Sequence, residues 1–356
     1  MALDVPTSCA HPTVRGTSTY TVMGFAGYAI GNVVGAVLAS LWGLTLVARL
    51  ITFLVPPLAF LAVVYLVRRI VRKERIVFYQ TTIPGVVAVA LAAVLAGAPA
   101  ARCVDITVIG MGIFLVFGRI GCFSVACCHG RPARHGIVYG AAHVKLGFWA
   151  RWSGRRLWPV QLVESAASLG LVVAALALGW DAPGAPALIY ITGYAVVRFT
   201  LENFRGDTAR PYKLGLSEAQ WTALATALAC LIWRPGAFTA AITGVLALGS
   251  TAIVALRTRR ELWSPPHLRA IDTSCAQVLR EPAARVETPL GVAISCHGLP
   301  DGRTDWVLSS THPAWSAPTA RRVAEALWRH PEVVEGRLAG VIHVITPATL
   351  AGDGHS

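Results

Sequence analysis

The sequence predicts an all-α polytopic membrane protein with seven or eight transmembrane helices, followed by a small C-terminal soluble domain of the α+β class. Of the 356 residues, 55% are hydrophobic and only 14% are charged, and the mean hydropathy is +0.58. Soluble globular proteins carry about 25% charged residues. The apolar residues gather in long runs, and the composition changes abruptly near Trp263. Two domains are therefore expected, residues 1–262 and residues 263–356.

A transmembrane helix needs about 20 mostly apolar residues, and eight runs meet or approach that length. They cover residues 20–38, 41–67, 83–100, 104–125, 159–179, 185–203, 217–233 and 236–256. The sequence Arg234-Pro235-Gly236 separates the last two runs. These two runs form either two spans or one bent unit, so the expected count is eight or seven.

After Trp263 the pattern changes to shorter segments. Residues 286–299, 305–311 and 338–347 alternate apolar and polar side chains, as strands do. Residues 317–330 repeat apolar side chains at helical spacing instead. These segments predict the α+β domain, to which we assign no function.

The net charge of +13 belongs to the apolar part of the chain. Residues 264–356 hold 8 Arg, no Lys and 9 acidic residues, a net of −1. Of the 31 basic and 18 acidic residues, 23 and 9 therefore lie in residues 1–263, a net of +14. A basic chain often binds nucleic acid, but no basic nucleic-acid motif lies between these runs, and no nucleic-acid partner is expected.

Arginines within or beside the apolar runs are the first functional candidates. An arginine at the bilayer centre costs at least about 2.5–3.5 kcal/mol, so it should face a partner, water or a ligand. Arg119 ends one run and Arg198 lies in another. Spacings of four and three residues put Tyr194, Arg198, Glu202 and Arg205 on one helix face. Two interpretations stay open: an Arg198–Glu202 ion pair, or a basic stripe that holds an anionic phospholipid headgroup.

Four segments in order carry a resemblance to a known family. Residues 118–131 read GRIGCFSVACCHGR, similar to the signature G-R-x-G-N-F-x-N-x-E-x-x-G-R, and residues 158–164 read WPVQLVE, similar to H-P-S-Q-L-Y-E. Residues 193–207 read GYAVVRFTLENFRGD, similar to Y-G-x-x-R-x-x-x-E-x-x-R-x-x-D, and residues 214–221 read LGLSEAQW, similar to L-G-x-S-x-G-Q. Near the N-terminus, Thr19-Tyr20 is a looser match to W-Y-G-L-M. Over roughly residues 20–233 the chain thus resembles the prolipoprotein diacylglyceryl transferase family.

The resemblance implies a multi-pass enzyme of the bacterial cytoplasmic (inner) membrane. Such an enzyme transfers diacylglyceryl from phosphatidylglycerol to the lipobox cysteine thiol of a prolipoprotein and releases glycerol phosphate. The expected partners are phosphatidylglycerol, membrane lipid and the prolipoprotein signal-peptide region, with no cofactor and no metal. The residues expected to form the phosphatidylglycerol site are Arg119, Tyr20, Tyr194, Arg198, Arg205 and Gln161. Of these, Gln161 is expected to support the other side chains from behind, as is Glu164. The residues expected to act in catalysis are Arg119, Arg198, Arg205, Glu202 and His129.

The sequence also departs from the family pattern. The segment that should carry the family's catalytic H-G-G motif reads YQTTIPGVV (79–87) and contains no histidine. In the signature, Cys122 and Val125 replace the two Asn, and Cys127 replaces the Glu. His129 and His135 are the nearest candidates for a base. The alternative function is therefore a non-catalytic or repurposed phospholipid-binding protein of the same family.

Cys122, Cys127, Cys128 and His129 form a cluster of soft ligands in the sequence. The adjacency of Cys127 and Cys128 constrains any shared site, so a packing role is expected. A metal site, or a redox or acyl-accepting thiol in a thiol-dependent membrane enzyme, are the alternatives.

The loops give conflicting signals about orientation. By the positive-inside rule, the basic segments 68–75, 131–156, 205–213 and 257–260 share the cytoplasmic side. The family resemblance instead puts the segment after the signature, with the headgroup site, on the outer face, and we follow the family. Residues 131–157, which contain Trp152 and are followed directly by Trp158, are expected to be an interfacial anchor to anionic lipid.

Overall fold

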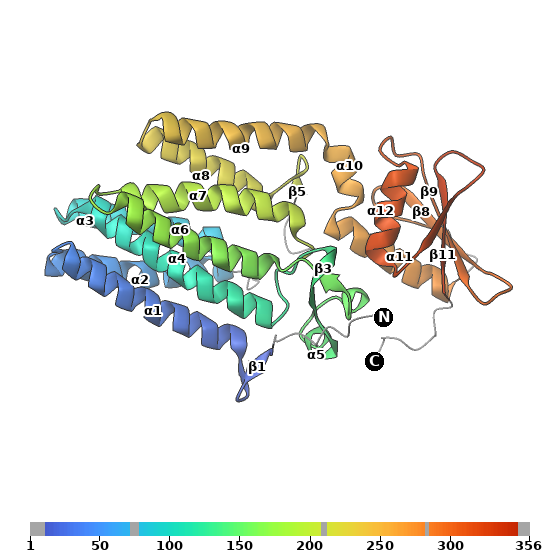
Figure 1. Cartoon of the computed structure of the whole chain (residues 1–356), viewed down its shortest axis with the longest axis horizontal. Helices are drawn as coiled ribbons and strands as arrows, with labels where there is room; N and C mark the ends of the chain where they lie inside the picture. The colour runs from blue at the N-terminus through green and yellow to red at the C-terminus, as the bar shows by residue number, and fades with distance from the viewer. Residues whose placement is uncertain (1–10, 72–77, 208–211, 282–284, 348–356) are drawn as a thin grey trace.

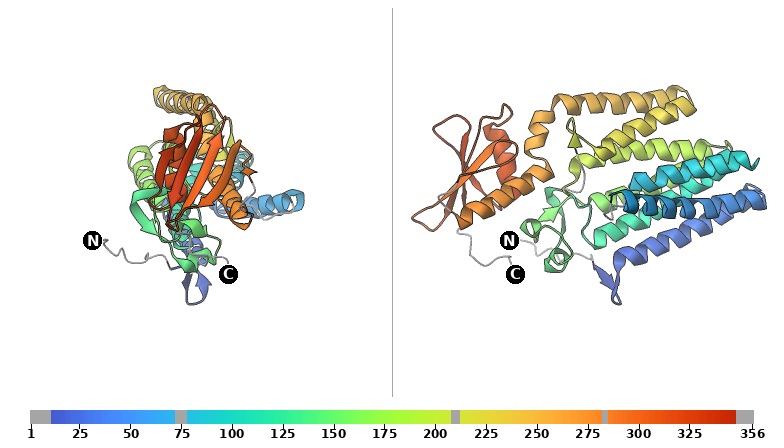
Figure 2. Two further views of the ribbon diagram at one scale, coloured as in Figure 1. Left: turned by 90° about the vertical axis from the view of Figure 1, so that its right-hand side faces the viewer. Right: turned by 180° about the vertical axis from the view of Figure 1, so that it is seen from behind.

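A computed structural model describes residues 11–71, 78–207, 212–281 and 285–347. The molecule is elongated, with a bundle of helices at one end and a β-sheet with its helices at the other (Figures 1 and 2). An irregular segment, residues 126–157, lies between the two and is called the arm. Residues 257–347 are called the tail.

The bundle has a helix in each of the eight apolar ranges. These helices are α1 (Thr19–Leu41), α2 (Leu46–Val71), α3 (Phe78–Leu95), α4 (Ala100–Ser124), α6 (Val160–Gly179), α7 (Ala185–Leu201), α8 (Glu218–Trp233) and α9 (Ala237–Ala255). Among the described residues, five of them, α1, α2, α4, α6 and α9, are long and apolar enough to cross a membrane. The chain is therefore a mostly helical, multi-pass membrane protein.

Small residues set the closest helix contact, between α1 and α4. A Cβ added at Gly31 would lie 2.9 Å from the Gly110 carbonyl oxygen, and one at Gly27 would lie 2.9 Å from the Phe117 Cβ. Glycines at such positions let two membrane helices approach until their backbones touch. This contact fixes the start of α1 beside the end of α4, where the signature begins.

The last two apolar runs form two helices. Helices α8 and α9 run side by side in opposite directions (Figure 1), and Arg234-Pro235-Gly236 makes the turn between them. Thr243 on α9 donates a hydrogen bond across the pair to the Ala227 carbonyl, at 3.2 Å. The last two runs therefore form two helices and not one bent unit.

Helix α7 ends before Glu202 and Arg205, the last two residues of the series that was predicted to lie on one helix face. The α-helix stops at Leu201, a 3₁₀ turn covers Glu202–Phe204, and Arg205 is extended. The turn occurs because the chain here pairs with the arm: Gly130 and Arg205 form an antiparallel bridge, and the Gly206 N–H donates to the His129 carbonyl at 2.9 Å. The prediction that Arg205 continues the helix face is thus wrong, although its side chain still joins the same cluster.

The arm contains a short hairpin and two single turns of helix. The hairpin pairs β3 (Pro132–Val138) with β4 (Arg156–Leu157), and the turns are α5 (Ala141–Val144) and the 3₁₀ helix Ala150–Trp152. Two further hairpins precede helices of the bundle: β1 (Thr13–Val14) with β2 (Thr17–Ser18), and β5 (Tyr212–Lys213) with β6 (Leu216–Ser217).

The tail contains a five-stranded antiparallel sheet in the order β10-β11-β9-β8-β7. Its strands are β7 (Val286–Glu287), β8 (Val292–Gly298), β9 (Thr304–Ser310), β10 (Glu332–Glu335) and β11 (Val341–Thr346), and its helices are α10 (Arg257–Leu262), α11 (Pro265–Arg280) and α12 (Ala317–Leu327). Helices α11 and α12 lie between the sheet and the bundle (Figures 1 and 2). Helix α12 and three of the strands lie where the sequence predicts them, whereas α11 and β10 were not expected.

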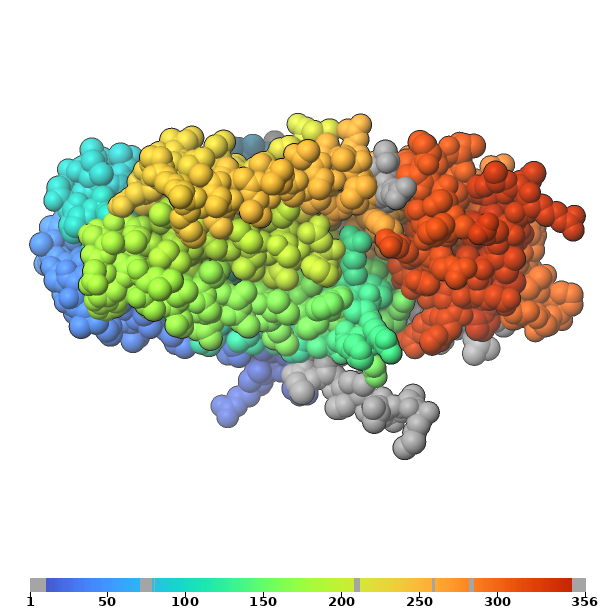
Figure 3. Space-filling model, turned by 45° about the horizontal axis from the view of Figure 1, so that its top comes forward, coloured from blue at the N-terminus to red at the C-terminus, as the bar shows by residue number. Residues whose placement is uncertain are grey.

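The arm and the tail share one hydrophobic core, and the tail lies directly beside the arm (Figure 3). Trp152 of the arm is fully buried and donates its indole N–H to the Ala326 carbonyl at 2.9 Å. Arg155 donates to the same carbonyl at 2.6 Å, and Arg151 pairs with Asp272. Trp152, Arg151 and Arg155 therefore hold the tail, and the expectation that this Trp and these charges anchor the arm to lipid is wrong for them. Trp158 is 44% exposed.

Candidate functional site

Three helices bring charged side chains together at the end of the bundle that faces the arm. Arg119 comes from the end of α4, Glu164 from the start of α6, and Tyr194 and Arg198 from the end of α7. Glu164 lies at the centre: its Oε1 accepts from Arg119 Nη2 at 2.9 Å and from the Tyr194 hydroxyl at 2.7 Å, with Arg198 Nε at 3.9 Å. One carboxylate oxygen thus joins two of the three arginines of the predicted site, Arg119 and Arg198.

A second carboxylate extends this group along the chain. Glu202 Oε2 lies 2.6 Å from Arg198 Nη2 and 4.0 Å from Arg205 Nε. The Arg198–Glu202 ion pair expected from the spacing of four is therefore present. We call Arg119, Arg198 and Arg205, with Glu164, Glu202 and Asp207, the arginine cluster.

Asp207 closes the cluster on the side of the arm. Its two oxygens accept from Arg205 Nε and Nη2 at 2.8 and 2.9 Å, a bidentate pair. Burial alone would raise the pKa of Asp207, but the Arg205 guanidinium holds that pKa below its usual range. The carboxylate is therefore charged at neutral pH, and the three acids balance the three arginines.

The arginines retain donors that no group among the described residues uses. The three residues are between 1% and 5% exposed. Within the described parts of the chain, Arg119 Nε, Arg198 Nη1 and Arg205 Nη1 are buried without a hydrogen-bond partner. A buried N–H group without a partner costs about 1–3 kcal/mol, and more when it is charged. Three such nitrogens in one cluster are donors that an anion can satisfy, while the buried Oε2 of Glu164 also has no hydrogen-bond partner among the described residues.

Two glycines allow residues 125–131, called the signature loop, to pack closely against the start of α6 and the segment after α7. A Cβ at Gly130 would lie 2.3 Å from the Trp158 carbonyl oxygen, and one at Gly206 would lie 2.6 Å from the Gly130 carbonyl oxygen. Neither position has room for a side chain. Arg131 adds a bond from its Nε to the Arg205 carbonyl, at 2.8 Å. The segments around 130, 158 and 206, which match the family pattern, thus form one packed unit.

Gln161, expected to contact lipid, instead braces this loop. Its Nε2 donates to the Cys127 carbonyl at 2.8 Å and to the Tyr139 hydroxyl at 3.2 Å. Tyr139 is fully buried in the arm, and no sequence signal pointed to it. The Ser217–Gln220 part of the LGLSEAQW segment is a capping box for α8, in which each side chain accepts from the other residue's backbone N–H.

The remaining candidates lie at the edge of the cluster. Tyr20, at the start of α1, is half-exposed and lies against Gly121 of the signature. His129 is buried: its Nδ1 faces the Gly130 carbonyl at 3.0 Å, and its ring meets Phe148 and Trp152 edge-on. Burial lowers the pKa of His129, so the imidazole is neutral at pH 7. His135 lies on strand β3 of the arm and is exposed.

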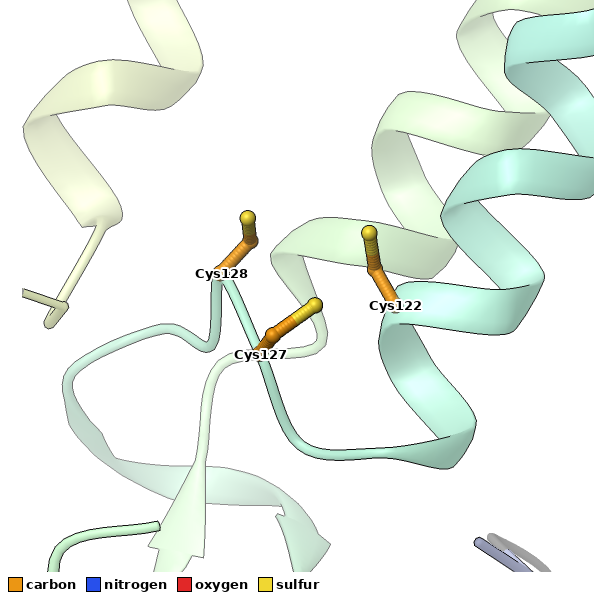
Figure 4. A group of neighbouring side chains, drawn as sticks. All are labelled: Cys122, Cys127 and Cys128. Carbon is orange, nitrogen blue, oxygen red and sulfur yellow. The ribbon is translucent and has the colours of Figure 1, made fainter. Parts of the chain in front are cut away.

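The three cysteines of the signature come together, although two of them are adjacent in sequence. The sulfur atoms of Cys122, Cys127 and Cys128 all lie within 4.8 Å of one another, at the end of α4 and in the loop that follows (Figure 4). None of the three is in a disulfide. Cys103 and Cys230 are buried singly in helices, as expected for cysteines that only pack.

Comparison with known proteins agrees with these segments. The sequence model described as prolipoprotein diacylglyceryl transferase matches residues 28–234, more than half of the chain. The chain belongs to the prolipoprotein diacylglyceryl transferase family. No curated protein matches it significantly.

The matched range includes every charged member of the arginine cluster and ends at Arg234, before α9 and the tail. It also includes the positions where this member of the diacylglyceryl transferase family carries cysteines instead of the signature's polar residues. The arginine cluster therefore belongs to the family part of the chain.

Proposed function

We propose that this protein transfers the diacylglyceryl group of phosphatidylglycerol to the thiol of a lipobox cysteine in prolipoproteins. Family membership supports prolipoprotein diacylglyceryl transfer as the reaction class. The observation that supports an anionic phospholipid donor is the set of buried guanidinium nitrogens on Arg119, Arg198 and Arg205 that have no hydrogen-bond partner in the part of the chain that the structure describes.

The chemistry of the transfer needs positive charge at one defined point. The thiolate of the substrate cysteine attacks the glyceryl carbon, the C–O bond to the phosphate breaks, and glycerol phosphate leaves with the bonding electron pair. Negative charge therefore develops on the leaving phosphate, where oriented guanidinium N–H groups stabilise it. Glu164 and Glu202 hold the three arginines in position for this.

We assign the other expected residues to supporting roles. Tyr20 is exposed enough to donate to a glycerol or phosphate oxygen, while Tyr194 acts through Glu164 and Gln161 through the loop. With Nδ1–H donated to the Gly130 carbonyl, His129 has its Nε2 lone pair available to accept the proton of the incoming thiol.

The arrangement in the membrane is part of the proposal. Helices α1 to α4 and α6 to α9 each cross the bacterial cytoplasmic membrane, which gives eight spans in a domain of residues 1–262. Residues 263–356 belong to an α+β domain that lies outside the membrane together with the arm, whose core it shares. The lipid enters the arginine cluster at the headgroup level, from the end of the bundle that faces the arm.

The test is transfer of a labelled diacylglyceryl group from phosphatidylglycerol vesicles to a lipobox peptide by the purified full-length protein. Removing one donor from a site that stabilises developing charge costs about 100- to 1,000-fold in rate. We expect Arg119→Ala and Arg205→Ala each to lower the rate by that much. His129→Gln should abolish transfer while phosphatidylglycerol binding persists.

Arg102→Ala is the matched control, because Arg102 is also a helix arginine with an acidic partner, Asp105, but lies at the opposite end of α4. This variant should keep the wild-type rate. The second candidate function, a phospholipid-binding protein without activity, is favoured by the missing histidine in residues 79–87. Binding of phosphatidylglycerol by the wild type, weakened by Arg119→Ala, with no transfer above background, would establish that candidate and exclude the transferase.

A further inference from the structure

The sulfur atoms of Cys122, Cys127 and Cys128 converge on one point beside the arginine cluster. Each lies within 4.8 Å of the other two (Figure 4). Cys122 is buried in the last turn of α4, while Cys127 and Cys128 lie in the loop that follows. Adjacent cysteines in an extended strand would point to opposite faces, so this loop must turn both sulfurs to the same side.

A strained backbone achieves that turn. Ala126 and Cys128 both adopt left-handed conformations, with φ of 58° and 55°. Such conformations cost on the order of 1–3 kcal/mol each for residues other than glycine, and they persist only where the surroundings fix them. Here the surroundings do: the Cys127 carbonyl accepts from Gln161 at 2.8 Å, and the His129 carbonyl accepts from the Gly206 N–H at 2.9 Å. The three sulfur positions are therefore preorganised.

We propose that Cys122, Cys127 and Cys128 bind one soft, thiophilic d¹⁰ metal ion, Cu(I) or Zn(II), through three thiolates. Thiolate sulfur selects these ions. With metal–sulfur bonds of about 2.3 Å, three ligands around one ion lie about 4 Å apart. The observed sulfurs reach that geometry by small side-chain rotations, because every pair is already within 4.8 Å.

The charge around the group suits a thiolate complex. Three thiolates around Cu(I) or Zn(II) carry a net charge of −2 or −1. The positive charges of Arg119 and Arg205 act on Cys128 across this part of the site. These two arginines are already paired with Glu164 and Asp207, so they favour a thiolate at Cys128 locally while the complex as a whole keeps its negative charge.

The coordination number distinguishes the two ions. Among the described residues, the group of potential metal ligands contains these three cysteines and no histidine or carboxylate. His129 is turned away, with Nδ1 at the Gly130 carbonyl and its ring against Phe148 and Trp152. Three sulfurs complete a trigonal Cu(I) site, whereas Zn(II) would need water as a fourth ligand.

The experiment measures metal retention by the purified, fully reduced full-length protein under anaerobic conditions. In one arm Cu(I) is supplied from a chromophoric competing chelator, and in the other Zn(II) is added and free metal is removed by gel filtration. We expect one equivalent of one of these ions per chain. Cys122→Ser and Cys128→Ser should each lower retention by about tenfold or more. Cys103→Ser and Cys275→Ser alter single buried cysteines elsewhere and should retain one equivalent.

X-ray absorption is measured on the metal-loaded wild type, so it tests the site even if a serine variant fails to fold. Three sulfur neighbours at about 2.2–2.4 Å support the site. The proposal is overturned if neither ion is retained, if Cys122→Ser and Cys128→Ser retain as much metal as the wild type, or if absorption finds nitrogen and oxygen neighbours only. Because the readout is metal rather than lipid transfer, its result is independent of the proposed function.

Discussion

At the scale of single residues, the arginine cluster is neutral but still rich in donors. Arg119, Arg198 and Arg205 are balanced by Glu164, Glu202 and Asp207. Each guanidinium offers five N–H groups, and one nitrogen of each arginine (Arg119 Nε, Arg198 Nη1 and Arg205 Nη1) is buried without a hydrogen-bond partner among the described residues. The acids therefore lower the cost of burying three arginines near the membrane while leaving them able to bind a phosphate. Arg131, bound to the Arg205 carbonyl, adds positive charge beside the cluster.

Glu164 is the residue on which this balance depends. Glu164→Gln keeps the size of the side chain but leaves the buried Arg119 without its partner, and breaking a buried ion pair costs about 3–5 kcal/mol. We expect the free energy of unfolding in detergent to fall by that amount. Tyr194→Phe removes one hydrogen bond to the same oxygen and should cost only about 1–3 kcal/mol. Equal losses in the two variants would mean that Glu164 does not compensate the arginines.

The candidate site was predictable from sequence where its residues are close along the chain. The Arg198–Glu202 pair follows from a spacing of four on one helix. The central position of Glu164 does not, because it depends on the ends of α4, α6 and α7 meeting in space. The meeting of the cysteine sulfurs was not predicted for a different reason. It requires a left-handed backbone conformation at Ala126 and Cys128, which residues other than glycine rarely adopt.

At the scale of elements, apolar runs predict helix positions well, because the membrane requires backbone hydrogen bonds to close within each span. Each of the eight predicted runs contains a helix. The end of α7 was set instead by the bridge between Gly130 and Arg205, a contact between distant segments. Helix α11 had a readable signal that was not used: Leu268, Ile271, Cys275 and Val278 are buried at helical spacing.

Helix α11 makes the tail sensitive to acid through His267. Its Nδ1 faces the Leu262 carbonyl at 2.6 Å and its Nε2 faces the Thr288 hydroxyl at 2.9 Å, which ties the start of α11 to the region of β7. Burial lowers the pKa of His267 below its usual value of about 6.5. The unfolded tail therefore binds a proton more readily than the folded tail as the pH falls through and below about 6.5.

We expect the stability that His267 contributes to be fully present above about pH 6.5 and to be lost as the pH falls toward the lowered folded pKa. The protection factors of the α11 amides, which compare their exchange with the intrinsic rate at each pH, should fall over this interval in the wild type. His267→Gln cannot take up the proton, so its protection factors should depend less on pH. The same loss of protection in both proteins would assign the acid sensitivity to another group.

At the scale of the whole molecule, the arm couples the bundle to the tail. Its fully buried Trp152 lies in the core shared with α11, α12 and the sheet, and Arg155 binds the Glu325 and Ala326 carbonyls at the end of α12. The same arm holds the signature loop through Tyr139 and Gln161. The tail therefore packs against the arm and stabilises the signature loop, which contains two of the three cysteines and His129.

Removing Trp152 should loosen the tail. Truncating a buried tryptophan costs about 3–5 kcal/mol, so Trp152→Ala should increase hydrogen exchange across Ala317–Leu327, the helix that receives its hydrogen bond. Trp158→Ala is the control, because Trp158 directly follows the arm in sequence but is 44% exposed. Unchanged exchange at α12 in Trp152→Ala would mean that the tail is held by the sheet side of the core alone.

The orientation of the molecule follows from which end carries the site. The ends of α2, α4, α7 and α9, the arm and the tail all lie at the end with the arginine cluster, while the turns at Gly43 and Gly97 lie at the other (Figure 1). Arg68 and Arg69 end α2 at the cluster end, so the positive-inside rule would put this end in the cytoplasm. The proposed transfer instead requires this end of the bundle to lie on the outer face. In that case the cluster arginines bind a ligand and do not act as loop charges that orient the chain.

We expect alkaline phosphatase, which is active only after export, to be active when fused to the tail and inactive when inserted at the Gly43 turn. A fluorescent protein that matures only in the cytoplasm should give the opposite pattern at the two positions. The physical reason is that the charge rule counts Lys and Arg in loops, whereas the cluster arginines are buried in the folded site and paired with Glu164, Glu202 and Asp207. If the phosphatase is active at Gly43 and inactive on the tail, the loop charges decide the orientation. The arginine cluster would then take its phospholipid from the inner leaflet, where exported prolipoproteins are not presented.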